Sequence, residues 1–165
     1  MSEIDKKTEN IIEKTMETAM KELSPLYDHI DFCVEQAGNG IFRASVPSSR
    51  KITNHFNTIH AAVQFAVAES LGGLVWRSLN MGKGYIIVVR NLSIDFKRPA
   101  FSGINAQARF GEADVNRLKN ALDSDGRCDY EVKSEIRDED DGQIVSVVTA
   151  CYAIRSAEKL QNKKP

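Results

Sequence analysis

The chain has 165 residues, a formal net charge of −1 and a hydrophobic content of 42%. This length suits one domain with a sizeable core, and the near-neutral charge provides no strong field for binding nucleic acid or a membrane surface. The polar start of the chain is neither a signal peptide nor a transit peptide, and polar residues interrupt the longest apolar run, so we expect no membrane span. Three cysteines match no zinc or redox spacing and favour a reducing compartment, so we expect a cytoplasmic protein without a metal.

The first elements in chain order are a helix and a hairpin. Residues 3–23 place apolar side chains near one face and lysines and glutamates on the other, which predicts an N-terminal helix within residues 1–24. The proline at position 25 ends it, because the residue before a proline is pushed out of the helical region. Two short apolar runs follow, at residues 30–37 and 41–47. The Gly-Asn-Gly sequence between them predicts a tight hairpin turn.

A long apolar helix and a second group of strands follow. After a polar loop, residues 59–76 are apolar on almost every side, and the helix is expected to end near Met81. A short helix is predicted at residues 112–122, closed by Asp125-Gly126. Alternating or continuous apolar runs predict four strands, at residues 85–100, 104–110, 128–137 and 144–154.

This order of elements predicts an α+β fold in one domain, residues 1–165. Short links join the last four strands, so an antiparallel sheet is expected. A sheet with one apolar face needs a cover, and the central helix is apolar enough to be the element around which the sheet wraps. The N-terminal helix is then an addition to this core. Residues 158–165 form a short basic end that we expect to be frayed.

The central helix carries one acid, Glu69, among apolar residues. A buried carboxylate is a candidate general base or nucleophile, and a structural acid at a dimer interface is the alternative. Gly72 and Gly73 follow three and four residues later, on the same side of the helix. They would open space beside the carboxylate, either for a ligand or for close packing of another helix.

The start of the same helix is a second candidate site. Asn57 or Thr58 is a suitable N-cap residue. The amides of His60, Ala61 and Ala62 would then belong to the first turn and lack partners within the helix. The helix dipole makes this end positive, so free amides there can stabilise an oxyanion.

The spacing between these two candidates predicts an oligomer. Nine residues separate His60 from Glu69, which puts them on opposite sides of an α-helix and about 13 Å apart along its axis. Two groups in this arrangement cannot share one pocket within one chain. If both act in one site, that site combines two chains, and the sequence therefore favours a dimer with composite sites.

These residues resemble a known family, the hotdog-fold acyl-CoA thioesterases, and most closely an uncharacterised subgroup of it. The resemblance covers most of the chain beyond the first helix. It is carried by Asn54, Thr58, His60 and Ala68-Glu69, and by the strand ending Phe96-Lys97-Arg98-Pro99-Ala100.

The resemblance implies a hotdog fold and hydrolysis of a thioester of coenzyme A or acyl carrier protein. Glu69 would activate water or attack the thioester, and the Ala61 amide would polarise its carbonyl group. Asn54 and His60 would shape that end of the site, or serve only as an Asx-turn residue and an ordinary histidine. Members need no metal or prosthetic group. Coenzyme A takes part only as a portion of the substrate. They assemble as dimers that often pair into tetramers.

The chain departs from related members at two places. Phenylacetyl-type members have Gly-Gly after the histidine, whereas Ala61-Ala62 stands here. Those members also place serine or threonine on the strand after the helix, whereas residues 87–90 read Ile-Val-Val-Arg. The amides of the helix start are kept, but ligand approach is tighter and the second polar helper is missing.

Two further residues are candidates for binding the substrate. Gln64, on the central helix, would contact the thioester or pair across a subunit interface. Arg98 would contact coenzyme A phosphates, or remain a solvated basic residue. The same alternatives apply to three other basic residues, Lys97, Arg50 and Lys51.

The sequence therefore favours a thioesterase acting on a small-molecule acyl thioester. A non-catalytic acyl-CoA-binding module is the first alternative, because the fold can bind a ligand without turning it over and the two departures leave room for this. An enoyl-thioester hydratase or dehydratase is the second alternative. Such enzymes pair a histidine with an acid in one site, which the spacing allows here only between chains.

Overall fold

The structure, a computed structural model, describes residues 3–80 and 84–157. The expected frayed end and the predicted helix end near Met81 lie outside these residues. The helices are α1 (Glu3–Leu23), α2 (Pro25–His29), α3 (Ala61–Ser78) and α4 (Glu112–Asp125), with a short 3-10 helix at Arg50–Ile52. The strands are β1 (Cys33–Gly38), β2 (Ile41–Val46), β3 (Tyr85–Phe96), β4 (Ile104–Arg109), β5 (Arg127–Asp138) and β6 (Ile144–Ser156).

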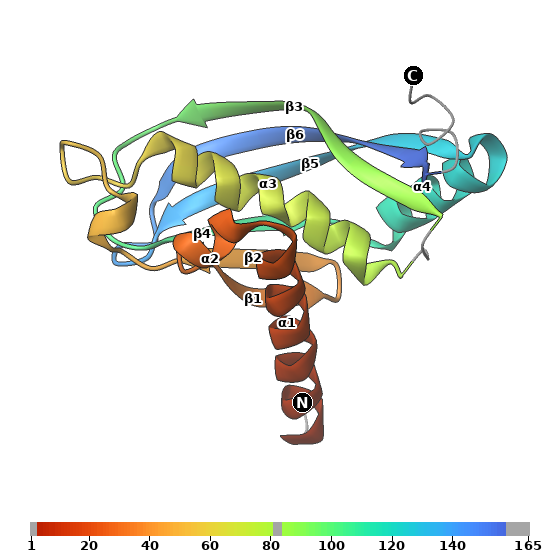
Figure 1. Cartoon of the computed structure of the whole chain (residues 1–165), viewed down its shortest axis with the longest axis horizontal. Helices are drawn as coiled ribbons and strands as arrows, with labels where there is room; N and C mark the ends of the chain where they lie inside the picture. The colour runs from red at the N-terminus through yellow and green to blue at the C-terminus, as the bar shows by residue number, and fades with distance from the viewer. Residues whose placement is uncertain (1–2, 81–83, 158–165) are drawn as a thin grey trace.

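The six strands form one sheet in the order β1-β2-β4-β5-β6-β3, and every neighbouring pair is antiparallel. The helix α3 lies along the concave side of this curved sheet, as Figure 1 shows. The predicted α+β architecture, an antiparallel sheet around a long central helix with an extra N-terminal helix, is confirmed. Because β3 comes last in the order, one of its edges has no neighbouring strand among the residues that the structure describes.

The core lies between α3 and the inner face of the sheet. Along β5, buried residues alternate with exposed ones, as expected for a strand whose successive side chains point to opposite faces. Leu71 and Leu74 of α3 are fully buried, and so is Ile136 of β5. The apolar character of the helix therefore comes from its contact with a sheet that curves around it.

The N-terminal segment contains a helix that the sequence did not predict. Only Ser24 separates α1 from the five-residue α2, and Pro25 stands at the start of α2, where a missing N–H costs nothing. The end of α1 packs against the body while the rest of the helix projects away from it (Figure 1). The strand expected from residue 30 begins at Cys33, because α2 and a turn through Asp31, with φ of 55°, occupy the preceding residues.

The predicted turns are confirmed in their backbone conformation. Asn39 and Gly40 both have positive φ angles, 53° and 73°, as a two-residue hairpin turn between β1 and β2 requires. Gly126 ends α4 in the left-handed region with φ of 63°.

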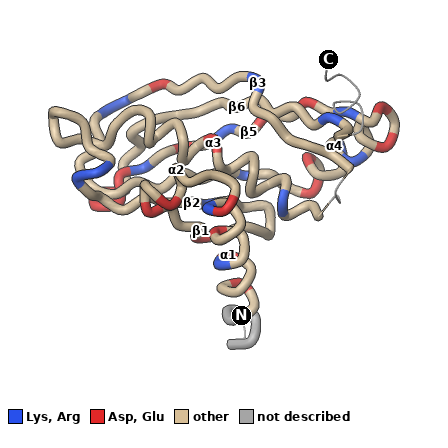
Figure 2. The backbone as a smooth tube through the Cα atoms, viewed as in Figure 1, with Lys and Arg blue, Asp and Glu red and all other residues tan. Residues whose placement is uncertain are grey.

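Charged residues of both signs are interspersed over the molecule, as Figure 2 shows. None of the described helices is long and apolar enough to cross a membrane.

A buried acid, Asp138, closes the loop between β3 and β4. Its side chain is 3% exposed and accepts hydrogen bonds from the amides of Phe101, at 2.8 Å, and Asp140, at 3.1 Å. The Ser102 hydroxyl also donates to it. Burial acts to raise the pKa of Asp138, but these hydrogen bonds favour the charged form and hold its pKa below the ordinary value.

Candidate active site

The carboxylate of Glu69 is held on one side and open on the other. The Tyr27 hydroxyl donates a hydrogen bond of 2.6 Å to Oε2 of Glu69. The other oxygen, Oε1, has no hydrogen-bond partner within the described part of the chain. It is also not one of the fully buried polar atoms that lack a hydrogen-bond partner. Oε1 is therefore not sealed from solvent, and Glu69 as a whole is half-buried. A carboxylate with one fixed and one open oxygen is suited to accept a proton from water.

The face of α3 that carries Glu69 is not covered by its own sheet. Ala61 and Phe65 precede Glu69 by two turns and one turn on this face, and both are exposed, Phe65 to 41%. The expectation of a helix buried on every side is therefore wrong. Because these three residues lie in one row, the carboxylate faces an open apolar surface rather than the interior of the sheet.

Two tyrosines of the sheet hold the backbone of α3 around Glu69. The Tyr152 hydroxyl donates to the carbonyl oxygen of Glu69 at 2.7 Å, and the Tyr130 hydroxyl donates to that of Gly72 at 2.8 Å. Their rings stack with centroids 5.2 Å apart. Burial raises the pKa of both phenols, which therefore stay protonated and donate over the whole ordinary pH range. Burial, and then the Glu69 charge and hydrogen bond, raise the pKa of Tyr27 in the same way.

The two glycines of α3 contact the chain itself. A Cβ atom at Gly72 would lie 2.1 Å from Cζ of Tyr152, so the ring occupies the space that this glycine leaves. At Gly73 a Cβ atom would lie 3.4 Å from Cε of Met20, in α1. The expectation that Gly72 opens space for a ligand beside Glu69 is therefore wrong. Gly72 allows a sheet tyrosine to pack closely against the helix, and Gly73 faces the end of α1.

The start of α3 presents one free amide. His60, rather than Asn57 or Thr58, is the N-cap residue, and its Nδ1 accepts a hydrogen bond of 3.0 Å from the Ala62 amide. The His60 amide itself donates to the Ile52 carbonyl at 2.8 Å. Within the described residues only Ala61, of the three amides considered, has no hydrogen-bond acceptor. Since Nδ1 of His60 accepts, the ring proton is on Nε2.

Asn54 organises the loop before α3. Its Oδ1 accepts from the amides of Phe56, at 2.9 Å, and Thr58, at 3.2 Å, and its Nδ2 donates to the Thr58 hydroxyl at 2.8 Å. This is the Asx-turn alternative of the two roles expected for Asn54. Its contribution is to fix the loop that leads to His60, and a contact with substrate stays a prediction.

Gln64 is paired within its own chain. It is 3% exposed, and its Oε1 accepts a hydrogen bond of 2.5 Å from the Ser146 hydroxyl in β6. The Gln64 amide nitrogen lies 3.5 Å from the Ile59 carbonyl oxygen. The hydrogen-bond partner found is a serine 82 residues later in the same chain, and a contact of Gln64 with the thioester or across a subunit interface stays a prediction.

The basic residues near the strand ending have partners of their own. Arg98 donates to Asp141 at 2.5 Å, linking the end of β3 to the β5–β6 turn. Lys51 lies 3.4 Å from Asp31. A contact between Arg98 and coenzyme A phosphates stays a prediction. The structure shows that Arg98 forms an ion pair with Asp141 in the acidic β5–β6 turn.

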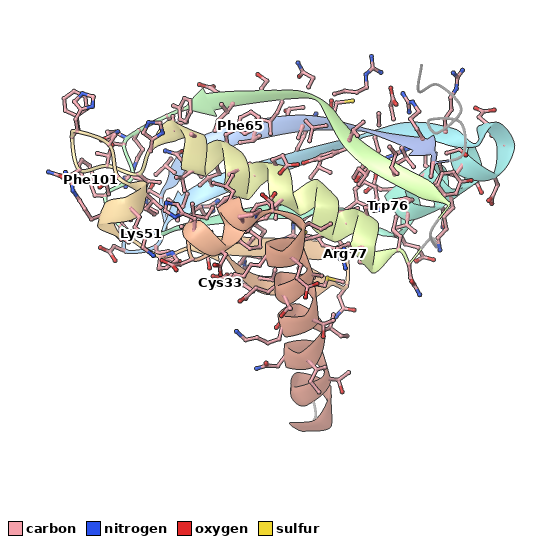
Figure 3. The ribbon with its side chains drawn as sticks, viewed as in Figure 1. Cys33, Lys51, Phe65, Trp76, Arg77 and Phe101 are labelled. Atoms are coloured by element: carbon pink, nitrogen blue, oxygen red, sulfur yellow. The ribbon has the colours of Figure 1, made fainter. Side chains whose placement is uncertain are left out.

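Apolar side chains are exposed near the start of α3. Phe101 is 67% exposed, and its neighbour Ala100 accepts a hydrogen bond of 2.8 Å from the Ile59 amide, just before the helix. Figure 3 shows Phe65 and Phe101 at this end of the molecule, with Trp76 and Arg77 toward the other end of α3. The described residues bring no three His, Cys, Asp or Glu side chains together as a metal site requires.

Three groups at the site were missed from sequence: Tyr27, Tyr152 and Ser146. Tyr27 is 42 residues from Glu69 along the chain and lies in a helix too short to show periodicity. Tyr152 lies in a strand predicted to be mostly buried, and the only sequence signal for its role was its polar hydroxyl group in that strand. A buried phenol needs a hydrogen-bond partner, but the sequence does not name that partner.

Comparisons with known proteins identify the family of the chain. The family described as "Domain of unknown function (DUF4442)" matches residues 13–153. No curated protein matches the sequence.

Solved structures match the fold over most of the chain. A Pseudomonas aeruginosa protein of unknown function, called a probable thioesterase, is 22% identical, with a TM-score of 0.77 over 87% of this chain and 95% of that one. A Chlorobaculum tepidum protein of unknown function is 12% identical, with a TM-score of 0.79 over 90% and 96%. A Haemophilus influenzae thioesterase is 18% identical, with a TM-score of 0.61 over 79% and 82%. The expected hotdog fold is thereby confirmed.

Proposed function

The chain belongs to the family described as DUF4442, and from the geometry around Glu69 we propose that it is a cytoplasmic hydrolase of acyl thioesters. The observation that carries the proposal is the divided environment of the Glu69 carboxylate. Tyr27 binds Oε2, while Oε1 is open to solvent on an exposed, apolar face of α3. Two structural relatives are named as thioesterases, which supports the same reaction class.

In the proposed reaction, Oε1 of Glu69 removes a proton from a water molecule. The water oxygen bonds to the thioester carbonyl carbon, and the carbonyl electron pair moves onto oxygen, where the Ala61 amide donates a hydrogen bond. When the carbonyl group forms again, the C–S bond breaks and its electron pair leaves with sulfur. The proton held by Glu69 then passes to the thiolate, so the carboxylate is restored and the products are an acid and a thiol.

The two catalytic groups come from different chains in this proposal. Ala61 and Glu69 are eight residues apart on one helix, which separates them by about 12 Å along its axis. One carbonyl group cannot contact both. A two-fold axis beside Phe65, midway between them, brings Glu69 of one chain to Ala61 of the partner subunit. The exposed Phe65 and the edge of β3 that no other described strand pairs with provide surfaces for such a dimer.

The test is hydrolysis of a panel of acyl-CoA thioesters by the purified protein and two variants. Glu69→Gln removes the base and is expected to abolish turnover. Ala61→Pro removes only the free N–H, because proline is tolerated at the first position of a helix and His60 already has extended backbone angles. Its rate is expected to fall about 100-fold or more. Ala61→Ser, which keeps the N–H, is the matched control and should retain activity.

Two results would contradict the proposal. The first is full activity in Glu69→Gln, which would remove the carboxylate from the mechanism. The second is tight binding of acyl-CoA by the wild-type protein without any turnover, which would favour a non-catalytic binding module.

A further inference from the structure

The hydrogen bond to Glu69 comes from outside the sheet and its central helix. Tyr27 lies in α2, which follows α1 after a single residue. The Tyr27 side chain is 7% exposed, and its hydroxyl reaches Oε2 of Glu69 at 2.6 Å. Figure 1 shows α2 beside the middle of α3, where Glu69 lies. The N-terminal segment therefore delivers a hydrogen-bond donor to the candidate catalytic base.

Packing fixes the position of this phenol. The Tyr27 ring lies against the ring of Phe32, with centroids 4.9 Å apart, and Phe32 has no exposed surface. The Phe32 amide donates to the Tyr27 carbonyl at 2.9 Å. One turn further along α3, Met20 of α1 packs at Gly73. The segment is thus anchored on α3 at two points, and the Tyr27 hydroxyl has little freedom to move.

We infer that Tyr27 is a positioning residue that holds Oε2 of Glu69 so that Oε1 is the oxygen presented to water. This inference rests on the proposed function. Without the phenol, the carboxylate is free to rotate and to exchange its two oxygens. Tyr27 is only 7% exposed and its hydroxyl already donates to Oε2 of Glu69, so it acts on the reaction only through Glu69.

No positive charge shares this task within the described residues. The titratable groups that face Glu69 are Tyr27 from α2, Tyr152 from β6 and, further away, Tyr130 from β5. Tyr152 binds the backbone carbonyl of Glu69 rather than its carboxylate. No described lysine, arginine or histidine forms an ion pair with Glu69. The single phenol donor therefore sets the orientation of the Glu69 carboxylate.

The experiment compares Tyr27→Phe with wild type by steady-state kinetics across pH on an acyl-CoA that the wild type hydrolyses. We expect kcat to fall about tenfold, as for loss of one hydrogen bond to a charged group, with KM unchanged. Tyr130→Phe is the control: it also removes a buried hydroxyl bound to α3, but at the Gly72 carbonyl. Its kcat should fall much less than that of Tyr27→Phe.

Each outcome decides between the inference and its premise. If wild type is active and Tyr27→Phe retains its kcat, the positioning role is wrong while the thioesterase proposal stands. If wild type hydrolyses no thioester, the proposed function fails and the role in catalysis fails with it.

Thermal melting of Tyr27→Phe, Glu69→Ala and the double variant tests this hydrogen bond in the absence of substrate, because alanine, unlike glutamine, has no side-chain acceptor for the Tyr27 hydroxyl. The loss in the double variant should be smaller than the sum of the two single losses, since both remove one hydrogen bond. Additive losses of stability would overturn the inference even if Tyr27→Phe had a lower kcat than wild type.

Discussion

Gly72 provides the sharpest stability prediction, because a methyl group there has no room. The added Cβ of Gly72→Ala would lie 2.1 to 2.4 Å from three atoms of the Tyr152 ring, whereas carbon atoms in contact are about 3.5–4.0 Å apart. The ring cannot move aside easily, since its hydroxyl binds the Glu69 carbonyl and its face stacks on Tyr130. Overpacking of this kind costs about 1–3 kcal/mol, and here the upper part of that range applies.

The net effect includes a gain in helix propensity of about 1 kcal/mol for replacing glycine by alanine. We therefore expect Gly72→Ala to lose about 2 kcal/mol of unfolding free energy, which lowers Tm by roughly 4–8 °C at this chain length. Gly73→Ala is the matched control on the next residue. Its Cβ would lie 3.4 Å from the flexible tip of Met20, so it should be neutral or stabilised by up to about 1 kcal/mol.

Urea unfolding and thermal melting of the two alanine variants would measure this difference. The reasoning is refuted if Gly72→Ala is as stable as wild type, or if Gly73→Ala loses more stability than Gly72→Ala. Either result would mean that the Tyr152 ring does not occupy the space beside Gly72.

Three further predictions concern the helix start, the buried acid and the substrate. His60→Ala should lose about 1 kcal/mol because it removes the N-cap acceptor for Ala62, and His60→Asn, a good N-cap, should recover it in urea unfolding. Folding lowers the pKa of Asp138, so its contribution to stability is present at neutral pH and is lost as the pH falls through that lowered pKa. On acidification below about pH 4, the Tm of wild type should therefore fall more than the Tm of Asp138→Asn. Parallel Tm curves for the two proteins would count against this reasoning. Arg98→Ala should raise KM for acyl-CoA but not for acyl-pantetheine, and an equal change for both would exclude a contact with the nucleotide phosphates.

The sequence predicted those parts of the fold that depend on local patterns. The alternation along β5 and the Gly-Asn-Gly hairpin turn follow directly from strand period and from backbone freedom at positive φ. The short helix α2 was missed, because five residues after Ser24 show no periodicity. The exposed face of α3 was also missed, since Ala61 and Phe65 are as apolar as their buried neighbours and composition does not separate an interface from a core.

The site was predicted only where one residue stood out from its surroundings. Glu69 was found because it is an acid in an apolar helix, and Ala61 because it follows a predicted helix start. Their partners were not found: Tyr27 is 42 residues from Glu69, and Ser146 is 82 residues from Gln64. Contacts at such separations depend on the tertiary fold, and no local pattern in the sequence encodes them.

Mixing two inactive variants tests the composite site most directly. In a dimer of one Glu69→Gln chain and one Ala61→Pro chain, a shared site has either both defects or none. Random exchange of the two variants should therefore restore about a quarter of wild-type thioesterase activity, since half of the dimers are mixed and each has one intact site. If both groups acted within one chain, every site would keep one defect. Activity that stays at the level of the separate variants after subunit exchange would contradict the two-chain mechanism.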